Sequence, residues 1–231
     1  MENYQIEQLV LGGIATNCWI VAYSPAGMTG PEDASAGATG YCAVIDPAEE
    51  APLIIAHLNR KGLCPAHILL THGHFDHIAA LPDLAGAYPE ALVAIHRGDA
   101  RYLGKGALEV HRQSFGAAGG SAAYVDKLWK AMPAPSLLLE DGDRVGPFTV
   151  ISLPGHTPGS AGFYLPEEKI LFSGDTLFRG DCGRVDLPGG DQRQIEESLK
   201  RLLAMDGGIR VLPGHGPATS IAAERGTRFF P

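Results

Sequence analysis

Residues 71–77 read Thr-His-Gly-His-Phe-Asp-His, and this short segment constrains the chain more than any other. It follows the apolar run at residues 68–70 and contains four metal-binding side chains: His72, His74, Asp76 and His77. Imidazole and carboxylate groups hold zinc, iron and manganese in proteins. Three histidines at the end of a buried strand would be unfavourable alone, because unpaired buried polar groups cost free energy. The segment therefore predicts a metal site.

Three later turns repeat this arrangement, in which an apolar strand runs into a glycine turn with one ligand-type side chain. These turns present His156, Asp175 and His215. Glycine permits a tight backbone path, and loops at strand ends often hold functional residues. Together with residues 71–77 the turns supply five histidines and two aspartates. Such a set suits two metals about 3.5–4 Å apart that share a hydroxide. The other histidines are interpreted as structural or surface residues: His57, His67, His96 and His111.

Composition excludes several other classes of protein. The chain has 231 residues, 45% of them hydrophobic, which is enough for a sizeable globular core. Its net charge is −8 and its basic residues are not clustered, so no nucleic-acid partner is expected. The first residues lack a signal peptide, and no apolar run is long enough to span a bilayer. Four widely spaced cysteines without a CxxC pair indicate reduced thiols in a cytoplasmic protein.

The order of apolar patterns predicts an α/β protein built from strand-helix units. Strands are expected at 8–11, 17–23, 41–45, 67–71, 91–96, 137–139, 148–153, 161–165, 170–173 and 209–212. Helices are expected at 49–61, 78–87, 191–205 and about 219–224. Residues 98–135 are interpreted as a variable helical insertion and residues 24–40 as a long loop. No linker divides the chain, so we expect a single domain over residues 1–231.

The set THxHxDH … GH … GD … GH resembles the metallo-β-lactamase-fold superfamily in order and context along most of the chain. The resemblance implies an αββα four-layer sandwich, with two mixed β-sheets and helices on the outer faces. It implies that His72, His74 and His156 form a first metal site. It further implies a second site of Asp76, His77 and His215, with Asp175 as the bridging carboxylate. Two divalent metal ions are expected, zinc first, with iron or manganese as alternatives.

Within that superfamily, residues 174–184 and the ending at 214–219 look most like the glyoxalase II branch, the hydroxyacylglutathione hydrolases, in their compact bacterial form. In that branch a basic residue nine positions after the bridging aspartate anchors a glutathione carboxylate. Arg184 stands there, and its guanidinium can grip a carboxylate with two hydrogen bonds. Two departures weigh against glutathione. Asp186 replaces an aromatic residue, and the helical domain that completes the glutathione site in larger members is absent.

These features predict a metal-dependent thioester hydrolase that uses metal-bound hydroxide as its nucleophile. Its expected partner is a small thioester, glutathione-linked or otherwise, and neither nucleic acid nor membrane is expected. Asp76 and Asp175 are the catalytic candidates, with Asp76 both a metal ligand and a candidate proton acceptor. Asp46 and Thr71 are candidates to orient the metal ligands from behind.

Other readings of the same residues stay open. A mononuclear iron persulfide dioxygenase would use His72, His156 and Asp175, and the pattern at 179–186 is shared with that branch. Lactone, β-lactam or other ester hydrolysis would suit the same metals. A nuclease would be expected to add a clamp domain or a basic surface. A non-catalytic binding module would tend to lose ligands, whereas all seven positions are filled here.

Overall fold

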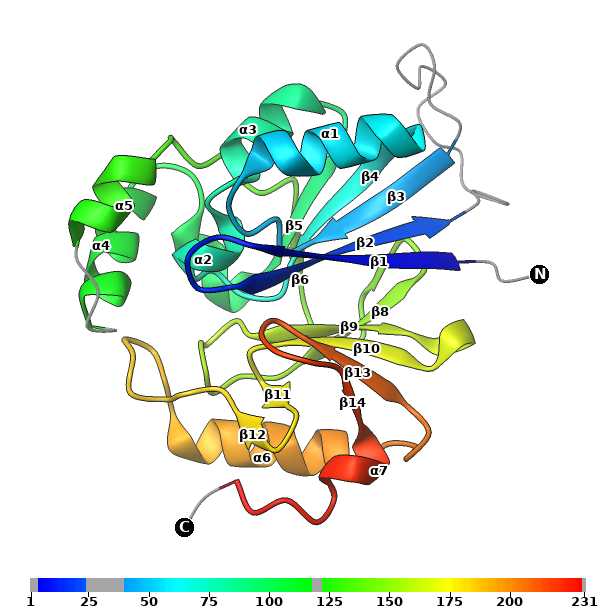
Figure 1. Cartoon of the computed structure of the whole chain (residues 1–231). Coiled ribbons are helices and arrows are strands. Elements are labelled where there is room, and N and C mark those ends of the chain that lie inside the picture. The colour runs from blue at the N-terminus through cyan, green and yellow to red at the C-terminus, as the bar shows by residue number, and fades with distance from the viewer. Residues whose placement is uncertain (1–3, 24–39, 118–121, 230–231) are drawn as a thin grey trace.

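The computed structural model describes residues 4–23, 40–117 and 122–229 (Figure 1). Two six-stranded β-sheets face each other, and helices cover their outer faces. This arrangement confirms the αββα sandwich of two mixed sheets that the resemblance implied. The candidate ligands follow the ends of strands from both sheets, so the fold gathers them at one edge of the sandwich.

The first sheet has the strand order β1-β2-β3-β4-β5-β6. Its strands are β1 (Tyr4–Leu11), β2 (Thr16–Tyr23), β3 (Gly40–Ile45), β4 (Leu63–Leu70), β5 (Leu92–His96) and β6 (Leu137–Leu139). β1, β2 and β3 pair antiparallel, whereas β3 to β6 pair parallel. The parallel strands are separated in sequence by α1 (Ala51–Lys61), α2 (Phe75–Ile78), α3 (Leu81–Ala87) and the 3₁₀ helix η1 (Arg97–Tyr102). The last four residues of β4 are fully covered, as expected for a strand packed on both faces.

The second sheet has the order β14-β13-β10-β9-β8-β7. Its strands are β7 (Arg144–Val145), β8 (Phe148–Ser152), β9 (Ala161–Leu165), β10 (Ile170–Gly174), β13 (Arg210–Pro213) and β14 (Thr219–Ser220). β10 and β13 are parallel, and their crossover runs through α6 (Gln192–Leu203) on the outer face (Figure 1). The chain also forms a separate two-stranded ribbon of β11 (Leu177–Phe178) and β12 (Asp181–Cys182), the short 3₁₀ helix η2 (Pro166–Glu168), and α7 (Ile221–Glu224).

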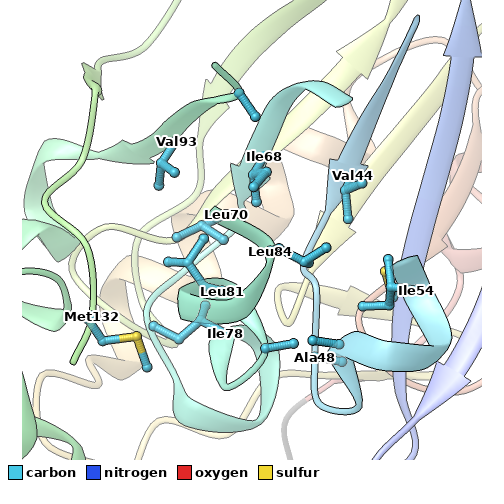
Figure 2. Packing of buried hydrophobic residues seen from close by; sticks show 14 of the residues in the cluster. Val44, Ala48, Ile54, Ile68, Leu70, Ile78, Leu81, Leu84, Val93 and Met132 are labelled. Atoms are coloured by element: carbon cyan, nitrogen blue, oxygen red, sulfur yellow. The ribbon is translucent and has the colours of Figure 1, made fainter. Parts of the chain in front are cut away.

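One hydrophobic layer lies between the first sheet and its helices. Figure 2 shows Val44 and Ile68 of the sheet in the same cluster as Ile54 of α1 and Leu84 of α3. All four are fully buried. In α1 the spacing of Ile54 and Leu58 places both on the face that meets the sheet. This layer supports the β4 end from which residues 71–77 emerge.

Two further layers complete the core. Between the sheets, Trp19 of the first sheet packs edge-on against Phe172 of the second, with ring centroids 6.0 Å apart. Beneath α6, Ile195, Leu199 and Leu202 are buried at helical spacing, as expected from the sequence. Asp191 caps the N-terminus of α6, because its side chain accepts a hydrogen bond from the backbone N–H of Gln194.

Several element boundaries differ from the expected ones. The helix expected at 78–87 is two helices, α2 and α3, and α3 begins with Pro82 in its first turn. Proline lacks the N–H that a continuous helix needs, so it starts a helix more readily than it extends one. β1 begins four residues before the expected start, and β4 begins at Leu63 despite Pro65. The sequence pattern alone indicated only the most strongly apolar part of each strand.

The expected insertion at 98–135 contains most of η1 followed by α4 (Ala107–Ala117) and α5 (Ala122–Leu128). Its helical character is therefore confirmed in the described residues. Of the expected loop at 24–40, residues 24–39 lie outside the described part of the chain, and Gly40 begins β3. The four cysteines are all unpaired. Over the described ranges, every helix is too short or too polar to cross a bilayer.

Candidate metal centre

The seven candidate ligands emerge from strand ends of both sheets. His72 and His74 follow β4, while Asp76 and His77 lie on α2 directly after them. Backbone hydrogen bonds connect the two sheets at this edge. Ala161 N–H donates to Thr71 O over 2.8 Å, and Asn17 N–H donates to Gly214 O over 2.7 Å.

His156 follows β8, Asp175 follows β10 and His215 follows β13. The ligand atoms of His72, His74 and His156 all lie within 4.8 Å of one another. These three rings are buried, and their centroids are 4.5–4.9 Å apart. Burial together with the neighbouring histidines lowers the pKa of His72 well below its usual value and that of His74 to about 3. The rings of His72 and His74 are therefore neutral at physiological pH and can offer lone pairs.

Hydrogen bonds on the far side of the rings determine where those lone pairs point. His156 Nδ1 lies 2.8 Å from Arg184 O, which only accepts, so Nδ1 carries the proton. Thr71 Oγ1 donates to Asp46 Oδ2 over 2.6 Å and lies 3.1 Å from His72 Nδ1, so Nδ1 of His72 donates to it. In the neutral form of both rings, Nε2 therefore bears the lone pair. Neither Nε2 has a hydrogen-bond partner among the described residues, and the same holds for His74.

The second group contains Asp76, His77 and His215, whose ligand atoms also lie within 4.8 Å of one another. His77 Nε2 is 3.5 Å from Asp76 Oδ2 and 3.2 Å from His215 Nε2. His215 Nε2 is 3.3 Å from the same carboxylate oxygen. Burial opposes the charge on Asp76, but His77, His215 and His74 together outweigh it and the pKa of Asp76 falls below its usual value.

Asp175 lies between the two groups. Its Oδ1 is 3.4 Å from His77 Nε2, and its Oδ2 is 3.7 Å from His156 Nε2 and 3.5 Å from His215 Nε2. Burial acts to raise the pKa of this carboxyl, yet the charge of His77 lowers it to about 2. One carboxylate thus reaches both groups, which is the position of a bridging ligand.

The chemistry of this donor set fits two cations. Histidine Nε2 atoms without hydrogen-bond partners among the described residues converge, and two ionised carboxylates with side-chain exposures of 13% and 11% lie beside them. Burial alone would lower the pKa of His77, but Asp175 and Asp76 raise it instead. That shift indicates an excess of negative charge, which bound cations would offset. Which side chains bind metal stays a prediction, and the structure brings all seven together.

Asp46 and Thr71 lie directly behind the ligands. Asp46 Oδ2 is 3.0 Å from His77 Nδ1, while Oδ1 accepts the backbone N–H of Thr71 over 2.8 Å. Asp46 is almost fully buried and adopts a left-handed backbone conformation with φ 51°. The carboxylate can only accept from His77, so the Nε2 atom of that ring faces the centre. That Asp46 and Thr71 orient the metal ligands stays a prediction.

Asp99 was missed by sequence reasoning. It lies in η1, is fully buried, and accepts hydrogen bonds from Gly73 N (2.9 Å), Thr157 Oγ1 (2.8 Å) and Gly159 N (2.8 Å). It therefore connects the loop that holds His72 and His74 to the loop that holds His156. The only sequence signal was an aspartate shortly after the strand at 91–96, and no ligand-type spacing distinguishes it.

A cavity of about 400 Å³ opens over the centre. Its polar wall consists of His74, Asp76, His156, Asp175 and His215. Its apolar wall is formed by Ile14, Phe75, Phe115, Phe178 and Leu187. The remaining lining residues are His111, Ser114, Cys182, Gly183 and Arg184.

His111, interpreted from the sequence as structural or surface, and Arg184, expected to bind substrate, both line the cavity. His111 is fully buried and reaches the cavity, while its Nε2 lies 2.9 Å from Tyr102 O. Burial lowers its pKa to about 4. Arg184, the expected substrate-binding residue, does line the cavity, but its guanidinium holds Asp186. Nε donates to Oδ1 and Nη2 to Oδ2, each over 2.7 Å.

Comparison with known proteins identifies the family. The family model described as the Metallo-beta-lactamase superfamily matches residues 36–215. "Probable metallo-hydrolase YqgX" of Bacillus subtilis (strain 168) is 36% identical over 188 residues, which cover 80% of this chain and 84% of that protein. "Hydroxyacylglutathione hydrolase GloC" of Haemophilus influenzae is 35% identical over 189 residues, which cover 81% of this chain and 86% of the relative.

A solved structure agrees with these relatives. The crystal structure of TTHA1623 in a di-iron-bound form superposes with a TM-score of 0.77 and 36% identity, covering 96% of this chain and 98% of the other. A dinuclear metal centre is thus found in a protein of the same fold and similar length. The folded arrangement, the family match and the named relatives agree, and the chain therefore belongs to the metallo-beta-lactamase superfamily of metallo-hydrolases.

Proposed function

We propose that this protein is a glyoxalase II-like hydrolase that cleaves thioesters at a centre of two divalent cations. The observation that supports this most is the convergence of unpaired histidine Nε2 atoms and two carboxylates beside a cavity of about 400 Å³. The Haemophilus relative is named as a hydroxyacylglutathione hydrolase, and this name supports a thioester as the substrate. The di-iron form of TTHA1623 supports two metals.

His72, His74 and His156 would hold one cation, and Asp76, His77 and His215 the other, with Asp175 shared. When bound, two divalent cations supply a hydroxide nucleophile at neutral pH and stabilise negative charge on the substrate carbonyl oxygen. Zinc is the first candidate, because a set rich in imidazole suits it, with iron or manganese as alternatives.

The residues of the chain orient the reaction around that centre. Asp46, Thr71 and the Arg184 carbonyl keep His77, His72 and His156 with Nε2 facing inwards. Asp76 lines the cavity, and its Oδ2 lies 3.2 Å from Thr16 Oγ1, which donates to it. We assign Asp76 as the group that receives the proton of the attacking water.

The overall reaction is balanced without a strong protein acid. A new C–O bond forms at the carbonyl carbon, and the C–S bond breaks as the thiolate leaves with its electron pair. Thiolates are stable at neutral pH relative to alkoxides, so the leaving group needs little help. The thiolate then takes up a proton, and the products are a carboxylate and a free thiol.

The test is metal analysis combined with assays on several thioesters. Protein purified without added metal would be analysed for zinc, iron and manganese, then assayed with S-lactoylglutathione and with the uncharged S-hexanoyl-N-acetylcysteamine. We expect two metals per chain and thiol release that a chelator abolishes. His72→Ala and Asp175→Ala should bind fewer metal ions and lose thiol release. One iron per chain with oxygen uptake on glutathione persulfide would replace this proposal with a persulfide dioxygenase. Turnover of lactones but of no thioester would also overturn it.

A further inference from the structure

The cavity beside the candidate metal centre has few basic side chains. Arg184 is the only lysine or arginine among the described residues that line it. The residues outside the described part of the chain contain neither lysine nor arginine. Among the lysine and arginine side chains that line the cavity, a substrate carboxylate thus has only Arg184 as a partner.

That cation is already engaged by the chain itself. Two of the three guanidinium nitrogens of Arg184, Nε and Nη2, donate to the two oxygens of Asp186. A substrate carboxylate would have to displace Asp186 from this edge of the guanidinium or bind the remaining Nη1 side next to Asp186. It would also meet the negative charge of Asp186 at close range. The pair is roughly half-exposed, with side-chain exposures of 48% and 64%, so it is an exchangeable competitor rather than a fixed structural bond.

Other residues that line the cavity favour apolar groups. Ile14 at the turn between β1 and β2 is 47% exposed, which is high for a large aliphatic side chain at the mouth of a cavity. Phe75, Phe115, Phe178 and Leu187 also line the cavity. An apolar substrate group placed here would be removed from water together with these side chains, which favours binding.

We propose that the site takes thioesters with an apolar acyl group and an uncharged thiol portion, and that Asp186 disfavours glutathione by occupying Arg184. This assignment rests on the proposed thioesterase function and names its substrate class. Asp186 acts through Arg184 and through its own charge, so it is a specificity-determining residue without a part in the chemistry.

Binding of thioethers tests the assignment without requiring turnover. S-hexylglutathione and S-hexyl-N-acetylcysteamine share the apolar group and differ in the charged peptide, and calorimetry would measure both dissociation constants on metal-loaded protein. We expect the uncharged thioether to bind more tightly to the wild type. Asp186→Ala should tighten S-hexylglutathione about fivefold, the scale of one exposed ion pair, and leave the uncharged thioether within about twofold.

Two variants provide controls. Glu197→Ala removes the same charge from an exposed ion pair with Lys200 on α6, away from this cavity, and should leave both constants unchanged. Ile14→Ser should weaken both hexyl thioethers about fivefold, because it shortens the apolar wall. Thermal unfolding of each variant would confirm that it folds, as expected for exposed positions.

Hydrolysis separates the two proposals. With S-hexanoyl thioesters of glutathione and N-acetylcysteamine, we expect a higher kcat/KM for the uncharged carrier and a smaller difference in Asp186→Ala. Hydrolysis that favours glutathione, with thioether binding unaffected by Asp186→Ala, would overturn the specificity assignment and leave the thioesterase intact. No hydrolysis of either thioester, with thioether binding as expected, would refute the thioesterase and retain the assignment of an apolar, uncharged ligand.

Discussion

Replacing Asp99 should destabilise the protein and loosen the metal centre together. Asp99 is fully buried and accepts hydrogen bonds from the backbone N–H groups of Gly73 and Gly159 and from the hydroxyl of Thr157. Asp99→Ala leaves these three donors buried without that acceptor, at about 1–3 kcal/mol each. Removing the carboxylate also removes its own burial cost, which is the main reason that the pKa of Asp99 is raised. We therefore expect a net loss of about 3 kcal/mol in the free energy of unfolding.

Asp99→Asn is the matched milder change. Asparagine keeps the shape of the side chain but offers one acceptor oxygen, and its NH₂ group faces a donor. We expect a loss of about 2 kcal/mol. Urea unfolding in the presence of a chelator would measure both variants without a contribution from bound metal. Asp83→Ala, which removes an exposed ion pair with Lys130, is the control and should change stability by less than about 0.5 kcal/mol.

The same variants should weaken metal binding. Gly73 lies between His72 and His74, and Thr157 directly follows His156, so Asp99 positions both loops of the first group. Loss of such supporting bonds lowers metal affinity by about 10–100-fold. Zinc competition titrations would measure this. If Asp99→Asn unfolded within about 0.5 kcal/mol of the wild type and bound zinc equally well, the connecting role of Asp99 would be refuted.

Three further predictions concern residues around the centre. Burial lowers the pKa of His111 from 6.5 to about 4, so the stability that its neutral form contributes is present above about pH 6.5 and is lost as the pH falls toward 4. In chelator, the free energy of unfolding of the wild type should therefore fall about 2 kcal/mol more between pH 7 and 5 than that of His111→Gln. Gly214→Ala should abolish metal binding and activity, because a Cβ there would collide with Asp175 Oδ1 and lie 2.7 Å from His77 Cε1. Asp46→Asn should weaken one of two zinc sites about 10–100-fold, because it disrupts the partner of His77 Nδ1.

Each of these has a distinct contrary result. Parallel pH profiles for the wild type and His111→Gln would show that His111 does not titrate as described. Gly86→Ala is the control for the glycine substitution, because nothing lies within 4 Å of its Cβ position on α3. It should retain metal, and retention by Gly214→Ala as well would contradict the close packing. Two unchanged zinc affinities in Asp46→Asn would exclude the orienting role of Asp46.

The side chains of the candidate centre were predictable because each is marked locally in the sequence. His72, His74, Asp76 and His77 fall within six residues after one strand, and a glycine turn precedes each later ligand. The sandwich followed from the resemblance that these motifs support. The main strands and α6 followed from apolar periodicity.

The residues that sequence reasoning missed depend on contacts between distant segments. Asp99 lies 58 positions from Thr157, and nothing near Asp99 in sequence indicates that partner. Asp186 was recognised as a departure from the glyoxalase II pattern, but its pairing with Arg184 depends on the local backbone path. Pro82 lies in the first turn of α3, where proline is favoured. The prediction of one helix at 78–87 followed the apolar periodicity and gave this proline too little weight.

Metal stoichiometry tests the central claim most directly. Chelator-treated protein would be dialysed against zinc, freed of excess metal and analysed for metal per chain, in the wild type, His74→Ala and His215→Ala. We expect two zinc ions in the wild type and one in each variant, because the two histidines belong to different groups. A wild type that binds one ion, with the same number in His215→Ala, would contradict the dinuclear centre.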